Sequence, residues 1–200
     1  MPKASIPITG DPEADALLVE DPLALLIGML LDQQVPMEWA FRGPYNLKAR
    51  LGGRLDAAEI AALGPDRVVE IFCDKPALHR YPAVMARRTH ELCQYLVDHY
   101  KGDASKVWFR VTSGDELYRR LRELPGYGEE KAKIFMAILA KRLGKKPAGW
   151  EEAAAPFSDQ VPRSVADVAS AATLAKVREF KKAQKAAKRA KTDPPVAAKA

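Results

Sequence analysis

Apolar residues recur along this chain at spacings of three and four positions, the pattern of helices that bury one face. The clearest example has its apolar positions at Ala132, Phe135, Met136, Leu139 and Leu143. No stretch alternates apolar and polar residues for long enough to form a strand. Glycine and proline interrupt the helical pattern at short intervals, so we predict an all-α protein built largely from short helices.

Helix-capping residues predict where several of these helices begin. The Asp-Pro pairs at positions 11–12 and 21–22 each place a capping aspartate before a proline at the first helical position. The helix that starts at the second pair, at about 22–33, is almost wholly apolar and should be buried on most sides. A long helix is expected at about 82–100.

A helix, a tight hairpin and a second helix are predicted between positions 113 and 144. Ser113 and Glu116 have the spacing of a capping box, in which each side chain satisfies a free amide of the first turn. Pro125 ends this helix, and Gly126 and Gly128 can both adopt positive φ. Amides at this turn, together with the positive end of the second helix, would form a phosphate site.

The sequence LPGYG at 124–128 resembles the helix-hairpin-helix signature of the base-excision DNA glycosylases related to endonuclease III. The resemblance covers about residues 20–145 in the order of elements. It implies a two-lobed glycosylase domain at 21–170, between an N-terminal segment, 1–20, and a basic tail, 171–200. It also implies a damaged double-stranded DNA partner. The expected DNA contacts at the hairpin are Gly126, Tyr127, Gly128, Lys131 and Lys133. An ordinary glycine turn between packed helices is the alternative interpretation.

The polar residues after the apolar helix predict a second DNA contact. In the glycosylase family the corresponding helix ends in a glutamine that fills the space of an extruded base. Gln34 is at the matching position and Gln33 precedes it. The alternative is that these residues only cap the helix.

The catalytic residues of the family are displaced in this sequence. Relatives that also cut the strand carry a lysine two residues after the second hairpin glycine, where this chain has Glu130. Lys131 follows, about 100° further round the helix; it is a further catalytic candidate, but it would point elsewhere unless the hairpin is locally reset. In the family, an aspartate in a Val-Asp-x-His sequence supports the charge that develops on the sugar as the base departs. That sequence is absent here, which leaves three carboxylates in the following region as candidates for this role: Glu151, Glu152 and Asp159. The iron-sulfur ligands of endonuclease III are absent too, because no cysteine follows Cys93.

Charge is concentrated in two places along the chain. The whole sequence carries +6, but residues 176–191 carry +7 and the rest therefore carries −1. Residues 119–146, around the hairpin, carry +6, which is where a phosphate backbone would lie. We expect the tail to add nonspecific affinity for DNA, and its last residues, 192–200, to be disordered.

Other features limit the remaining function classes. The longest apolar run, at 23–31, is too short to cross a membrane, and no secretory signal is recognisable. We therefore expect a cytoplasmic, nucleoid-associated protein. We also expect it to be a monomer without cofactors. Two cysteines outside any CxxC pair, and His90 without further ligands, do not predict a metal site. Trp39 and Phe41 are expected in the core, with a base-stacking platform as the alternative. The loop at 74–82 is expected at the surface, with a pocket that His79 would face as the alternative.

Two hypotheses from different classes follow. The first is a DNA N-glycosylase that removes a damaged or mismatched base by hydrolysis, without Schiff-base chemistry. The second is a protein of glycosylase fold that binds DNA and cleaves nothing. The apparent retention of a wedge residue and of pocket-forming helices favours the enzyme, because a binding module needs only the hairpin.

Overall fold

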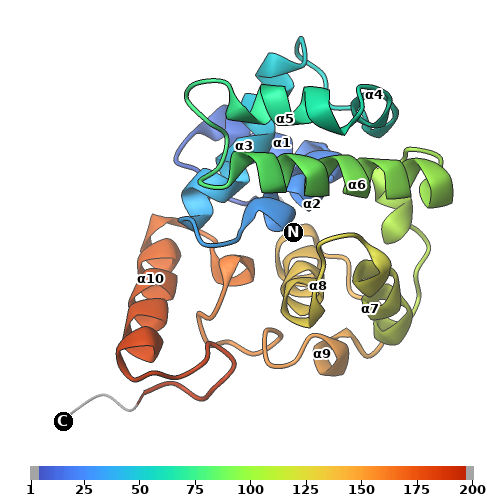
Figure 1. Ribbon diagram of the computed structural model, residues 1–200. Coiled ribbons are helices and arrows are strands. Elements are labelled where there is room, and N and C mark those ends of the chain that lie inside the picture. Colours follow the sequence, from blue (N-terminus) through green and yellow to red (C-terminus); the bar gives the residue numbers. More distant parts are fainter. Residues whose placement is uncertain (1–4, 197–200) are drawn as a thin grey trace.

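The computed structural model describes residues 5–196, and helices account for nearly all of the regular structure in that range (Figure 1). In chain order the elements are α1 (Pro12–Glu20), α2 (Pro22–Leu31), α3 (Met37–Arg50), α4 (Ala57–Ala62), α5 (Pro65–Cys73), α6 (Pro82–Tyr100), η1 (Ala104–Val107), α7 (Gly114–Glu123), α8 (Glu129–Leu143), α9 (Trp150–Ala153), η2 (Val165–Asp167) and α10 (Ala171–Ala186). Within residues 5–196 no strand forms, and Ser113 and Ala148 share one isolated bridge. The all-α prediction is confirmed.

The predicted helix starts agree with the observed caps. The side chain of Asp11 accepts hydrogen bonds from two amides at the start of α1, and Asp21 does the same for α2. At α7, Ser113 Oγ accepts from the Glu116 amide at 3.2 Å. The reciprocal half of the capping box is replaced, because the Glu116 carboxylate pairs with Arg120 at 2.6 Å.

Helix α2 lies at the centre of the fold and is buried along its whole apolar run. It packs against α1, α3 and α6 on one side of the molecule and against α8 on the other. Helices α7, α8 and α9 form the second group, below the first in Figure 1. From Ala132 to Ala140, α8 is buried at every position but Lys133, so α2 and α8 bring the two groups together through apolar surface.

The basic tail is packed, in contrast to the solvated arm that its composition suggests. Val177 and Gln184 of α10 are buried, and residues 187–196 fold back along the helix. The Gln184 side-chain amide donates to the carbonyls of Ala190, Asp193 and Pro194. Disorder was expected from position 192, yet Asp193 and Pro194 take part in this packing; positions 197–200 lie outside the described residues.

Among residues 5–196, no helix is both long enough and apolar enough to span a membrane.

Candidate nucleic-acid interface

The hairpin between α7 and α8 has the predicted shape. Helix α7 ends at Glu123, the Tyr127 amide donates to the Leu124 carbonyl at 3.0 Å, and α8 begins at Glu129. Gly126 has a φ of +80°, and a Cβ at this position would lie 2.3 Å from Leu30 Cδ1. Both the backbone conformation and the close approach to α2 therefore require glycine here.

The second hairpin glycine differs from the prediction. Gly128 has a φ of −71° and a ψ of 173°, which any residue can adopt, so the expectation of positive φ at Gly128 is wrong. A Cβ there would meet only Arg122 Nη1, at 4.0 Å. Gly128 borders open space, and the fold does not require glycine at this position.

Tyr127 is placed in the core rather than at the surface where a DNA contact was expected. Its side chain is 3% exposed, and its hydroxyl donates to the Leu26 carbonyl at 2.7 Å. The ring meets Phe135 edge-on, with centroids 5.8 Å apart. Burial raises the pKa of the Tyr127 hydroxyl well above its ordinary value. The residue therefore holds the hairpin against α2.

The first turn of α8 has no side-chain cap, because Gly128 occupies the N-cap position. Two carboxylates lie in this turn, and both are paired: Glu129 with Lys133 at 2.8 Å and Glu130 with Lys191 at 2.7 Å. The hydrogen bond from Lys133 is the main cause that lowers the pKa of Glu129. These pairs offset the negative charge that would otherwise repel a phosphate from the helix start.

Lys131 reaches back to the C-terminal end of α2. Its Nζ donates to the carbonyls of Met29 at 2.6 Å, Leu30 at 2.8 Å and Asp32 at 3.1 Å. Carbonyls at a helix end lack partners within the helix, and the lysine supplies them. Burial lowers the pKa of Lys131 to about 8, against the opposing effect of the Asp32 carboxylate.

His79 supports the same helix end from another direction. Its Nε2 lies 3.1 Å from the Leu31 carbonyl and donates to it, while Nδ1 accepts from the Tyr81 amide at 3.0 Å. These two contacts fix the neutral ring with its proton on Nε2. Burial lowers the pKa of His79. The loop at 74–82 is largely exposed, as predicted, but His79 within it is buried, with 1% of its surface exposed.

The loop that follows α2 carries the two predicted wedge glutamines. Gln34 is exposed and has a φ of +58°, and its side-chain oxygen accepts from the Tyr81 hydroxyl at 3.3 Å. Gln33 accepts from Arg88 Nη1 at 2.5 Å. Trp39 is 40% exposed beside His79, which contradicts its prediction as a core residue, whereas Phe41 is fully buried.

The three predicted catalytic carboxylates lie away from this loop. Asp159 pairs with Arg163 at 2.8 Å, and its carbonyl accepts from Lys141, roughly 15 Å along α8 from Lys131. Glu151 and Glu152 are exposed on α9, which packs at the start of α7, opposite the hairpin.

Two groups near Gln34 were missed as candidates. The Asp32 carboxylate is close enough to oppose the lowering of the pKa of both Lys131 and Lys181, which burial causes in each case. Asp32 stands directly before the glutamines and could have been selected for its position. Lys181 belongs to a lysine-rich helix, and nothing in the sequence distinguishes it from its neighbours.

No set of three or more histidine, cysteine or acidic side chains in residues 5–196 is gathered as metal ligands would be. No family model, curated protein or solved structure matches the chain.

Proposed function

We propose that this protein binds damaged double-stranded DNA in base-excision repair and acts as a DNA N-glycosylase. The observation that carries the proposal is the meeting of the hairpin, the start of α8 and the loop after α2 at one corner of the molecule. The contacts of Tyr127 with Leu26 and of Lys131 with Asp32 hold the three together. A backbone grip and a wedge residue then lie side by side, as extrusion of a base requires.

The hairpin supports the grip. The first amides of α8 lack a side-chain cap, and the space beside Gly128 is open. Positive partial charge at a helix start favours a phosphate there. Arg122 is exposed at the same turn, where its Nη1 donates to the Tyr127 carbonyl at 3.4 Å, and it adds a charge for the DNA backbone.

The loop after α2 supports the wedge. Gln34 is held in a left-handed conformation that costs about 1 kcal/mol or more for a non-glycine residue, and such strain is typical of functional loops. Trp39 and Tyr81 are each 40% exposed on either side of His79. Exposed aromatic faces of this kind stack well on an unpaired base.

The chemistry is assigned to Asp32 in this proposal, in place of Glu151, Glu152 and Asp159. As the bond between the base and C1′ breaks, the base leaves with the bonding electrons and takes a proton from solvent. Positive charge then develops on the sugar, and the Asp32 carboxylate stabilises it. A water molecule adds its oxygen to C1′ and gives up a proton, which leaves an abasic sugar.

A second candidate function is supported by the positions of the three predicted carboxylates, since Asp159 is paired with Arg163, and Glu151 and Glu152 lie on α9, away from Gln34. Lys131 supplies no alternative nucleophile, because all three hydrogens of its ammonium group have carbonyl partners. A protein that extrudes and holds a damaged base without cleaving it would need no more than the grip and the wedge.

Base release from duplexes that carry a panel of damaged and mismatched bases tests the proposal. We expect release without borohydride trapping, and a loss of at least about 100-fold in Asp32→Asn, the scale seen when a stabilising group is removed from a transition state. Glu151→Gln, Glu152→Gln and Asp159→Asn are matched controls that should retain release.

Three results would contradict this assignment. Retained release in Asp32→Asn would remove the carboxylate role. Trapping that disappears in Lys131→Met would identify a lysine nucleophile. Absence of release, with duplex binding that Gly128→Val weakens, would identify the binding module. Gly128→Val suits this purpose because the position has an ordinary φ and open space, so the variant is expected to fold.

A further inference from the structure

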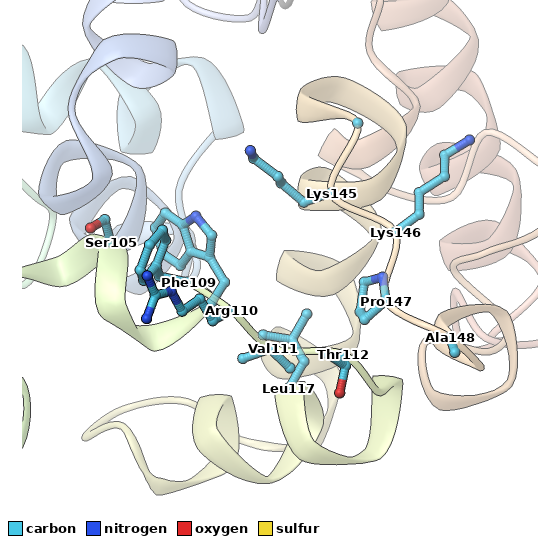
Figure 2. Close-up of a pocket in the computed structure, with 12 residues that line it drawn as sticks. Ser105, Phe109, Arg110, Val111, Thr112, Leu117, Lys145, Lys146, Pro147 and Ala148 are labelled. Atoms are coloured by element: carbon cyan, nitrogen blue, oxygen red, sulfur yellow. The ribbon is translucent and has the colours of Figure 1, made fainter.

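A cavity of about 650 Å³ lies at the opposite end of α8 from the hairpin (Figure 2). Its walls come from residues 108–112, before α7, and residues 144–148, after α8. Ser105 and Leu117 complete the lining. This volume is within the range of small-molecule and cofactor sites. Helix α8 has 15 residues, which separates the cavity from the hairpin by roughly 20 Å.

The charge of the lining is entirely positive. Arg110, Lys145 and Lys146 contribute to the walls, and no acidic residue does. Within residues 5–196, none of these three side chains has a carboxylate at salt-bridge distance, although many basic residues elsewhere in the chain are paired. Unpaired cations around a concave surface raise the local concentration of anions.

An aromatic ring stands at the edge of the cavity. Phe109 is 57% exposed, the largest exposure among the large apolar side chains described. The guanidinium of Arg110 lies over this ring, 5.0 Å from its centre. Arg110 has a φ of +57°, a conformation that is uncommon for non-glycine residues.

The two lysine side chains of the cavity lining extend in different directions. Lys145 extends toward the side of the opening where Phe109 and Arg110 lie, whereas Lys146 extends away from it (Figure 2). A ligand in the cavity would therefore meet Lys145 and Arg110 as cations and Phe109 as a stacking surface. The hydroxyl of Thr112 is also among the lining groups.

We propose that this cavity binds a nucleotide, with its base stacked on Phe109 and its phosphate on Lys145 and Arg110. Proteins bind single-stranded nucleic acids through a stacking surface next to cationic side chains, because every base has an aromatic face and every nucleotide has a phosphate. The ligand is either a free mononucleotide or one nucleotide of a single strand. The proposal does not depend on glycosylase activity at the other end of α8.

Calorimetry of the full chain with four probes tests the site: thymidine, inorganic phosphate, thymidine monophosphate and a thymidine tetranucleotide. We expect the two nucleotide probes to bind and the nucleoside or phosphate alone to bind much more weakly. A tetranucleotide that binds far more tightly identifies a single strand as the ligand, and equal affinities identify the free nucleotide. Phe109→Ala should weaken nucleotide binding roughly ten-fold, as loss of one stacked base does.

Lys145→Gln and Lys146→Gln form a matched pair, since they remove the same charge from adjacent positions. We expect a clear loss in Lys145→Gln and a smaller loss in Lys146→Gln. Equal losses would show attraction to bulk charge and would overturn the site. Failure of both nucleotide probes to bind below about 1 mM, or tighter binding of a glutamate-rich peptide of equal charge, would overturn it too.

Discussion

Lys131 and Lys141 are two largely buried lysines ten residues apart on the same helix, and their partners differ. Lys131, at the hairpin end of α8, donates to three backbone carbonyls. Lys141, at the other end, donates to the Asp167 carboxylate at 2.6 Å and to the Asp159 carbonyl at 2.5 Å. The Asp167 carboxylate also accepts from the amides of Arg163 and Ser164.

The difference lies in the charge of the partners. The Lys141 ammonium group compensates a buried carboxylate, so removal of either side chain would leave the other as an uncompensated charge. Carbonyl partners carry only partial charges, and burial lowers the pKa of Lys131 to about 8. The hairpin end of α8 therefore contains a lysine that titrates near neutral pH, next to the loop that carries Gln34.

The largest effect on stability is expected from Lys141→Met. The substitution leaves Asp167 as a buried, unpaired carboxylate, its side chain only 10% exposed, and breaking a buried ion pair costs about 3–5 kcal/mol. Chemical denaturation would measure the loss. The double variant Lys141→Met, Asp167→Asn should recover more than about 1 kcal/mol, since it removes the orphaned charge. A single variant as stable as the parent would show that the pair is only incidental.

Lys131→Met should cost less, about 2 kcal/mol at pH 7.5, because carbonyls at a helix end lose their donors but gain partial access to water. The cost should also depend on pH. Folded Lys131 loses its proton near pH 8, whereas the unfolded chain keeps it to about 10.5, so over this interval the unfolded state binds more protons.

The unfolding free energy of the parent, relative to Lys131→Met, should therefore rise as pH increases from 7.5 to 9.5, by about 2 kcal/mol. Denaturation of both proteins at several pH values would measure this difference. A difference between parent and Lys131→Met that is constant or falls with pH would contradict the assigned pKa.

The helices and the hairpin were predictable because their signals are local. Aspartate before proline marks the starts of α1 and α2, and the sequence LPGYG marks the turn before α8. Each signal acts within a few residues, through helix caps and backbone preferences that depend on the local sequence alone. Even here the agreement is partial, since Gly126 needs positive φ and Gly128 does not.

The site was less predictable because it depends on contacts between distant segments. Tyr127 was expected at the surface, but its hydroxyl bonds to Leu26, 101 positions earlier. Lys131 was expected to contact DNA, yet its ammonium group donates to carbonyls at the end of α2. Hairpin geometry alone cannot specify either contact, because both depend on how closely α2 and α8 pack. The cavity at the far end of α8 likewise arises from two loops brought together by the fold.

The smallest effect on stability is expected from three exposed lysines of α10, which provide the contrast to the two buried ones. Lys176, Lys182 and Lys185 lie on the helix surface, and changing all three to glutamine should alter the unfolding free energy by less than about 0.5 kcal/mol per site. Neutralisation is a cleaner test of the tail than truncation, because removal of the buried Gln184 would also remove its hydrogen bonds to Ala190, Asp193 and Pro194.

If these lysines neutralise DNA phosphates, fewer counterions are released in the triple variant. The slope of log affinity against log salt should then become shallower by up to about 3, roughly 0.9 for each lost contact. The preference for damaged over intact duplex should stay the same, because phosphate contacts carry no information about the base. Titrations of both duplexes at several salt concentrations measure the two quantities together. An unchanged slope would remove the tail from the DNA interface, and a lost preference would show that α10 contacts the lesion.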